Sequence, residues 1–190
     1  MPDPLIQLAD DRRQARESDD PCAGLCTLAS LNDAGWPDAR TLVLRDVDGR
    51  LAVFVNATSP KFAHLDRVSV VVWLPTINVQ YRLRCTTSPV PGRLVAESWQ
   101  LRPEPPKRMD WLYTLQQGQS TAIASRDALL DTLAGLALPD PLVAPETARG
   151  LFLNPEQIDR LDLGMDNGVH DRRRYLPGNP GGWIEEVLVP

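Results

Sequence analysis

The segment of this chain with the most obvious chemical potential is residues 38–45, DARTLVLR, which carries a guanidinium near each end. Its apolar middle predicts a β-strand, on which successive side chains point to opposite faces, so Arg40 and Arg45 are expected on different faces. A permanent charge beside a core strand is costly unless an anion meets it. Each arginine therefore binds either a carboxylate of this protein or a ligand that carries phosphate.

Other residue types that suit phosphate recur near the ends of the later predicted strands. They are Lys61, Gln80, the pair Gln119 and Ser120, and the run His170, Asp171 and Arg172. A solvated surface charge is the ordinary explanation for any one of them, but their recurrence favours an anion site. The chain has neither a G-x-G-x-x-G nor a Walker A sequence, so side chains would have to hold the phosphate.

Residues for acid–base or nucleophilic catalysis are sparse. Ser120 can be nominated with either histidine, but no nucleophile-elbow sequence surrounds any serine. No catalytic residue is assigned on this basis, and redox chemistry supplied by a cofactor is the better expectation. Three cysteines and two histidines do not make a metal site or a disulfide framework, and neither is predicted.

Composition narrows the class of protein. The 190 residues suit one domain with an appendage, and a net charge of −5 argues against a general nucleic-acid binder. No apolar run approaches the roughly 20 residues of a membrane span. The first residues show no signal-peptide pattern, so a cytoplasmic location without membrane or nucleic-acid partners is expected.

The elements that must position these residues follow from periodicity and turn signals. A helix is expected within residues 1–20, and a single domain within 21–190. Strands are predicted at 24–31, 38–46, 51–55, 68–74, 79–87, 150–153, 157–161, 170–175 and 183–189. Helices are predicted from Ser59 to about Asp66, in two pieces within 95–115, and at 125–137. Successive antiparallel strands with appended helices indicate an α+β protein built on a β-barrel.

The order of these pieces resembles the pyridoxamine 5'-phosphate oxidase family of FMN-binding split barrels. The likeness runs from about Cys26 to Pro190. The matching pieces are CTLA and RTLVLR at 26–45, FVN with SPK at 54–61, NVQY at 78–81, LRP at 101–103, QS at 119–120, HDR at 170–172, and Tyr175, Trp183 and the final LVP. Each piece is short, and their common order carries the resemblance.

The resemblance implies an antiparallel split β-barrel with peripheral helices, and FMN at the interface of a homodimer that includes C-terminal dimerisation strands. Carried over by position, the residues near the flavin would be Arg40, Thr41, Leu42, Val43, Val55, Asn56, Lys61, Gln80, Gln119, Ser120 and Arg172. Arg40 and Lys61 would meet the phosphate. Arg45, Arg102 and His170 would lie near the substrate.

The chain departs from the family pattern mostly on the substrate side. The family's lysine, tyrosine, arginine and serine that hold pyridoxal phosphate are Arg45, Ser98, Arg102 and Pro106 here. The arginine expected over the substrate ring is Gly168. On the flavin side, Pro60 replaces an arginine, and the tryptophan expected near Leu161 is absent.

Three functions remain open from the sequence. The first is an FMN-dependent oxidoreductase that is not an efficient pyridoxamine 5'-phosphate oxidase. The second is authentic oxidation of pyridoxamine or pyridoxine 5'-phosphate in a remodelled pocket. The third is a non-catalytic module that holds flavin or haem, because the fold alone does not determine function. The sequence names neither the substrate nor the electron acceptor.

Overall fold

A computed structural model describes residues 3–164, 167–178 and 181–190 of the chain. Its helices are α1 (Pro4–Glu17), the short 3-10 helices η1 (Pro60–His64) and η2 (Pro75–Ile77), α2 (Gly92–Gln100), α3 (Glu104–Leu115) and α4 (Arg126–Ala134). Its strands are β1 (Leu25–Leu31), β2 (Pro37–Val43), β3 (Arg45–Val47), β4 (Arg50–Asn56), β5 (Arg67–Leu74), β6 (Val79–Pro89), β7 (Ala148–Asp162), β8 (Asp171–Pro177) and β9 (Trp183–Leu188).

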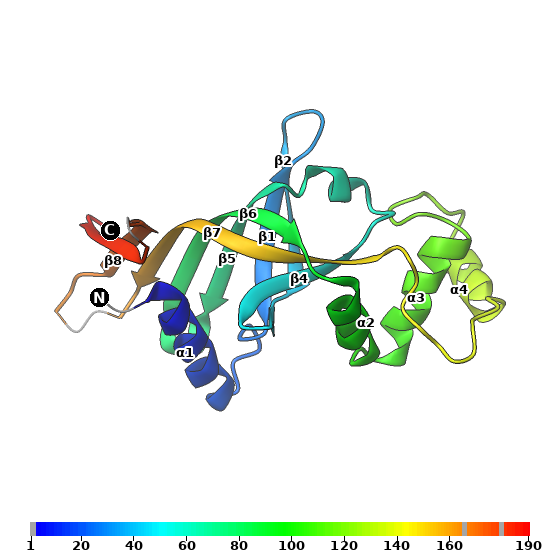
Figure 1. Ribbon diagram of the computed structural model, residues 1–190, viewed down its shortest axis with the longest axis horizontal. Helices are drawn as coiled ribbons and strands as arrows, with labels where there is room; N and C mark the ends of the chain where they lie inside the picture. The colour runs from blue at the N-terminus through cyan, green and yellow to red at the C-terminus, as the bar shows by residue number, and fades with distance from the viewer. Residues whose placement is uncertain (1–2, 165–166, 179–180) are drawn as a thin grey trace.

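The strands form one sheet in the order β2-β1-β5-β6-β7-β4-β3, and β8 and β9 extend it from the far half of β7. Every pair of neighbours is antiparallel. Strand β7 crosses most of the molecule, with α2, α3 and α4 toward one end and β8 toward the other (Figure 1). This curled antiparallel sheet with helices at its periphery confirms the predicted α+β split-barrel architecture.

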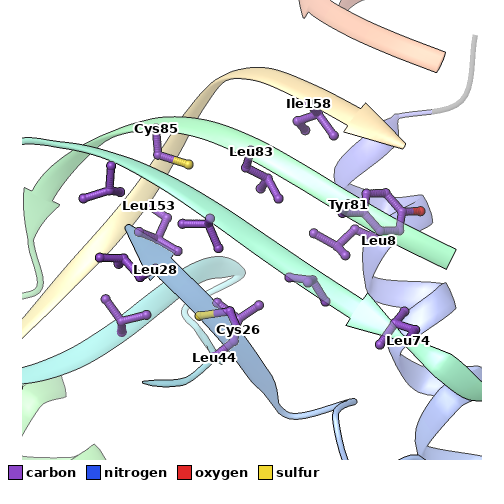
Figure 2. Packing of buried hydrophobic residues seen from close by; sticks show 14 of the residues in the cluster. Leu8, Cys26, Leu28, Leu44, Leu74, Tyr81, Leu83, Cys85, Leu153 and Ile158 are labelled. Atoms are coloured by element: carbon purple, nitrogen blue, oxygen red, sulfur yellow. The ribbon is translucent and has the colours of Figure 1, made fainter. Parts of the chain in front are cut away.

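The main core lies on one face of the sheet and against α1. Along β6, Tyr81, Leu83 and Cys85 are buried while Arg82 and Arg84 point to the other, exposed face, as alternation predicts. Leu8 from α1 packs into the same cluster, and Figure 2 shows it close to Tyr81. The N-terminal helix therefore shares its core with the sheet.

Helix α1 is held to the sheet by a buried arginine. Leu8, Arg12 and Ala15 form the buried stripe of this helix, at the spacing expected of one helical face. The Arg12 guanidinium donates to the carbonyls of Ala23 and Leu44, at 3.2 and 3.0 Å, and to the Asp46 carboxylate. One side chain thus fixes the helix, the start of β1 and the end of β2.

The predicted strand at 38–46 is divided at Leu44. Up to Val43 the chain pairs with β1, and from Arg45 onward it pairs with β4. At the division the Leu44 N–H donates to the Gly24 carbonyl, and the Leu44 carbonyl accepts from Arg12. Both backbone groups of Leu44 therefore have hydrogen-bond partners although this residue is paired with no neighbouring strand. The chain crosses here from one part of the sheet to another.

The predicted strands 150–153 and 157–161 are one strand, β7. Pro155 lies inside this strand and has no N–H to donate. On the side of β4 and β8 none is needed, because β4 pairs only up to Phe152 and β8 pairs only from Ile158. The extra residue, Glu156, is absorbed by a shift of register opposite Arg84 and Cys85.

The helices follow the sequence signals closely, with one exception. Helices α2 and α3 are separated at Arg102 and Pro103, and the Ser125 hydroxyl accepts from the Ala128 N–H at the start of α4. The helix expected from Ser59 to Asp66 is a five-residue 3-10 helix. Within the described residues, no helix has the length and apolar character needed to cross a membrane.

The role of Arg12 gives a stability prediction. Arg12→Ala removes the partner of Asp46 and leaves two carbonyls without a donor, so the free energy of unfolding should fall by about 3 kcal/mol. Urea denaturation followed by circular dichroism measures the change. Arg13→Ala is the matched control, because Arg13 is exposed and its bond to Asp10 should contribute less than about 0.5 kcal/mol. Equal stabilities of the two variants would contradict this role.

Candidate functional site

Two cations from separate elements lie close together at one edge of the sheet. Arg40 on β2 stands opposite Leu28 of β1 and donates to the Ser30 hydroxyl at 2.9 Å. Lys61 in η1 donates to the Ser59 hydroxyl at 2.8 Å. Burial lowers the pKa of Arg40, which nearby Asp38 partly offsets, and burial together with the positive charge of Arg40 lowers the pKa of Lys61.

The partners of these two cations are neutral. Among the described residues neither Arg40 nor Lys61 forms an ion pair, although most other arginines with a buried or half-buried side chain do. Two close and partly desolvated positive charges favour a bound group with about two negative charges, such as a phosphate monoester. Arg40 and Lys61 are therefore the candidate residues for the anion site that the sequence predicts.

A cleft of about 290 Å³ opens beside Lys61. It is lined by Leu42 of β2, by Phe54, Val55 and Asn56 of β4, by Lys61, by Arg102, by Pro106, Met109, Asp110 and Tyr113 of α3, and by Gln119. The cleft therefore brings together five residues predicted for the flavin (Leu42, Val55, Asn56, Lys61 and Gln119) and one predicted for the substrate (Arg102).

A buried amide at the end of β4 positions the loop that carries Gln119. The Asn56 side chain accepts from the Thr58 N–H and hydroxyl and donates to the Thr147 hydroxyl. The Thr58 hydroxyl oxygen in turn accepts from the Gln119 N–H at 3.1 Å. Ser120 follows with an exposed side chain and a φ of 73°. Asn56 thus connects the sheet to a loop more than sixty positions away.

Arg102 is not a free cation. It donates to the Asp110 carboxylate, and the same oxygen accepts from the Trp99 indole N–H at 2.9 Å. Asp110 is only 6% exposed. The arginine predicted to meet a substrate phosphate already has a buried anionic partner.

Sequence reasoning missed four residues of the cleft wall: Phe54, Met109, Asp110 and Tyr113. A signal for three of them exists, because positions 109, 110 and 113 follow Pro106 within α3 at spacings of 3, 4 and 7, which share one helical face. Burial and the nearby Asp110 charge raise the pKa of Tyr113. Its hydroxyl therefore stays protonated and able to donate at neutral pH.

A second group of predicted flavin residues lies elsewhere on the sheet. Leu161 of β7 stands opposite Gln80 of β6 on one side and Arg172 of β8 on the other. Arg172 donates to Asp159, which also binds Arg82. One oxygen of Asp159 is buried without a partner among the described residues.

The two groups cannot contact one flavin within a single chain. Strands β1 and β5 lie between Arg40 on β2 and Gln80 on β6, which corresponds to ~14 Å across the sheet. The side chains also differ in direction, since Arg40 lies on the face of Leu28 and the core, while Gln80 shares the opposite face with Arg82 and Arg84.

The remaining predicted residues lie outside the cleft. Arg45 lines a separate hollow of about 490 Å³ together with Ser98. The side chains of Thr41 and Val43 are exposed on the face of β2 that points away from Leu42. His170 directly precedes β8, beside the second group. No group of three His, Cys, Asp or Glu side chains that could hold a metal occurs in the described ranges.

The curled antiparallel sheet with peripheral helices defines the class of this protein, which is a split-barrel protein. No family model matches the chain. A pyridoxine/pyridoxamine 5'-phosphate oxidase from a Cyanothece species is 30% identical over 197 residues, covering 100% of this chain and 89% of that protein. One from Saccharopolyspora erythraea is 29% identical over 177 residues, covering 88% and 77%. The chain belongs to the pyridoxine/pyridoxamine 5'-phosphate oxidase family.

Two solved structures share the fold. PhzG from Burkholderia lata, solved in complex with tetrahydrophenazine-1-carboxylic acid, has a TM-score of 0.81 and 21% identity, covering 99% of this chain and 93% of that chain. A pyridoxamine 5'-phosphate oxidase-related, FMN binding protein from Nostoc punctiforme has a TM-score of 0.76 and 18% identity, covering 97% and 95%. At these identities the likeness concerns the fold.

The lowered pKa of Lys61 predicts a cost in stability. Between the lowered pKa of Lys61 and its ordinary value near 10.5, the unfolded chain binds the proton more readily than the folded chain, so the free energy of unfolding rises with pH in this range. Below this range Lys61 is charged in both states, and the folded protein carries the full cost of that charge. Lys61→Met should therefore raise the free energy of unfolding at pH 7 by about 0.5–1 kcal/mol. Lys107→Met should not, because it removes a bond to the Gln100 carbonyl and the contact of the Lys107 charge with the Trp99 ring, whose centroid lies 5.2 Å away. Thermal unfolding of the ligand-free protein measures both, and a less stable Lys61→Met variant would argue against charge strain.

Proposed function

We propose that this protein binds FMN and acts as an FMN-dependent oxidoreductase. The observation that carries the proposal is the pair Arg40 and Lys61, which lie close together without an ion-pair partner among the described residues, next to a cleft that Lys61 lines. A flavin phosphate supplies the missing negative charge, and the cleft offers walls for the ring. The names of the curated relatives and of the Nostoc protein support the same cofactor.

The residues of the cleft suit the parts of FMN. Arg40 and Lys61 would hold the phosphate, and backbone near Leu42 and Val55 would line the ring. Gln119, fixed through Thr58, would present an amide, and an amide can serve both donors and acceptors on the flavin edge. Bound FMN would supply hydride or electron transfer, for which this chain has no group of its own.

The protein residues would then bind, orient and exclude water. The neutral Tyr113 hydroxyl and the apolar side chains of α3 would cover the cleft where a substrate could lie against the flavin. The reaction class is oxidation of a small molecule with return of the electrons to oxygen or another acceptor.

A homodimer would complete this site. Because the group around Arg40 and the group around Gln80 and Arg172 cannot reach one flavin from one chain, each flavin would take the first group from one protomer and the second from its partner. Two-fold symmetry would then produce two equivalent sites.

A second candidate is authentic pyridoxine or pyridoxamine 5'-phosphate oxidation, which the names of the curated relatives favour. Arg102 is retained at the position that the resemblance gives to the substrate phosphate. The split barrel does not itself require a phosphorylated substrate, since PhzG holds tetrahydrophenazine-1-carboxylic acid.

The FMN assignment predicts a specific loss of affinity. Arg40→Ala or Lys61→Ala should each weaken FMN binding by about 1.5–3 kcal/mol, or roughly 10–150-fold, because each removes a charge-assisted contact. Fluorescence titration of FMN measures the dissociation constant. Arg50→Ala is the control, since Arg50 is held by Ser88 and Asn154 away from the cleft. No flavin binding by the unaltered protein, or equal constants in all variants, would refute the assignment.

The dimer assignment predicts complementation between variants. Arg40→Ala and Arg172→Ala each damage a different half of the site, so an equilibrated mixture should recover about a quarter of the wild-type FMN sites through mixed dimers with one intact site. A mixture of Arg40→Ala with Lys61→Ala should recover none, because both changes affect the same half. Sedimentation of the flavin-loaded protein as a monomer would contradict the assignment.

A further inference from the structure

The charges around the cleft are already balanced once a flavin phosphate is bound. Arg40 and Lys61 contribute two positive charges without an ion-pair partner in the described chain, which match one phosphate dianion. The other charged groups of the cleft wall are Arg102 and Asp110, one positive and one negative. No surplus positive charge is left for a second phosphate.

The pairing of Arg102 with Asp110 is built into the helices. Asp110 is fixed from two sides by Arg102 and by the indole of Trp99, which is 2% exposed. A carboxylate that is this buried remains charged only when it is paired, so Arg102 cannot leave it for a ligand without a large cost. Arg102 itself is 30% exposed and borders the cleft.

The separate hollow that Arg45 lines carries no excess of positive charge. Arg45 lines it, but the charged groups there are three bases, Arg12, Arg16 and Arg45, and three acids, Asp46, Asp48 and Glu97. The arginine that a partner protomer would add, Arg172, is bound to Asp159. The other side chains that line the cleft carry no charge: Leu42, Phe54, Val55, Asn56, Pro106, Met109, Tyr113 and Gln119.

From this charge balance we infer that the substrate of the flavin site is an uncharged compound and not a phosphate ester, and that Asp110 is the residue that excludes the phosphate. The inference rests on the proposed FMN site. Asp110 acts through Arg102: it occupies the guanidinium that would otherwise attract a second dianion, and its own charge repels one.

The test uses FMN-loaded protein and two probes that differ only in phosphate, 4-deoxypyridoxine and 4-deoxypyridoxine 5'-phosphate. Perturbation of the flavin absorption spectrum reports binding of each. FMN affinity is measured first on the same samples, so a failure of the FMN proposal is seen before the probes are added.

For the unaltered protein, the affinity for the phosphorylated probe should exceed the affinity for 4-deoxypyridoxine by less than about fivefold. Failure of both probes to bind also agrees with the inference. Asp110→Asn keeps an oxygen for the Trp99 indole but removes the charge, so it should gain at least about tenfold in affinity for the phosphorylated probe alone. Arg102→Gln in the Asp110→Asn background should abolish the gain.

Two outcomes would overturn the inference. One is a fivefold or greater preference of the unaltered protein for the phosphorylated probe. The other is an Asp110→Asn variant that binds FMN normally but gains no affinity for that probe. The first measurement does not depend on any variant, so the inference stays open to refutation even if Asp110→Asn fails to fold.

Discussion

The buried guanidinium of Arg12 is the interaction on which the arrangement of the site depends. It holds the carbonyl of Leu44 at the point where the chain leaves the pairing of β2 with β1 and begins the pairing of β3 with β4. Because the pairing partner changes at Leu44, residues 37–47 form two strands that lie in different parts of the curled sheet. On one side of this division Leu42 lines the cleft, and on the other side Arg45 lines a different hollow. A hydrogen-bonding side chain in the core thus determines which surface each flanking arginine reaches.

Arginine is abundant in this chain, and its partners distinguish structural from ligand-binding positions. Arg12, Arg160 and Arg172 contact carboxylates from other elements, and these pairs fasten α1 to β3, β7 to α1 and β8 to β7. Arg40 has only a hydroxyl and a carbonyl as partners and lies near a second cation. Because uncompensated charge destabilises a folded protein, such a pair is best explained by an anion that binds after folding.

Much of the fold could be predicted from the sequence, because strand alternation, turn residues and helix caps are local signals. The division at Leu44 and the continuity of β7 through Pro155 could not, since both depend on which strands lie alongside. The same holds for the site. The types of Arg40, Lys61 and Gln119 indicate an anion site, but their approach to one cleft depends on the curl of the sheet. The role of Asp110 required the structure, because an acidic residue on a helix is ordinarily solvated.

Helix α3 is a separate element from the sheet, and this separation has a consequence for how such proteins diversify. The residues suited to hold a cofactor lie on β2, β4 and η1, whereas most of those facing a second molecule lie on α3. By the inference drawn for Asp110, an exchange of a neutral residue for an acidic one on α3 would change the ligand preference while the sheet is left intact. A gene duplicate of an ancestral phosphate-ester oxidase could therefore acquire a new substrate in one mutational step without first losing its flavin.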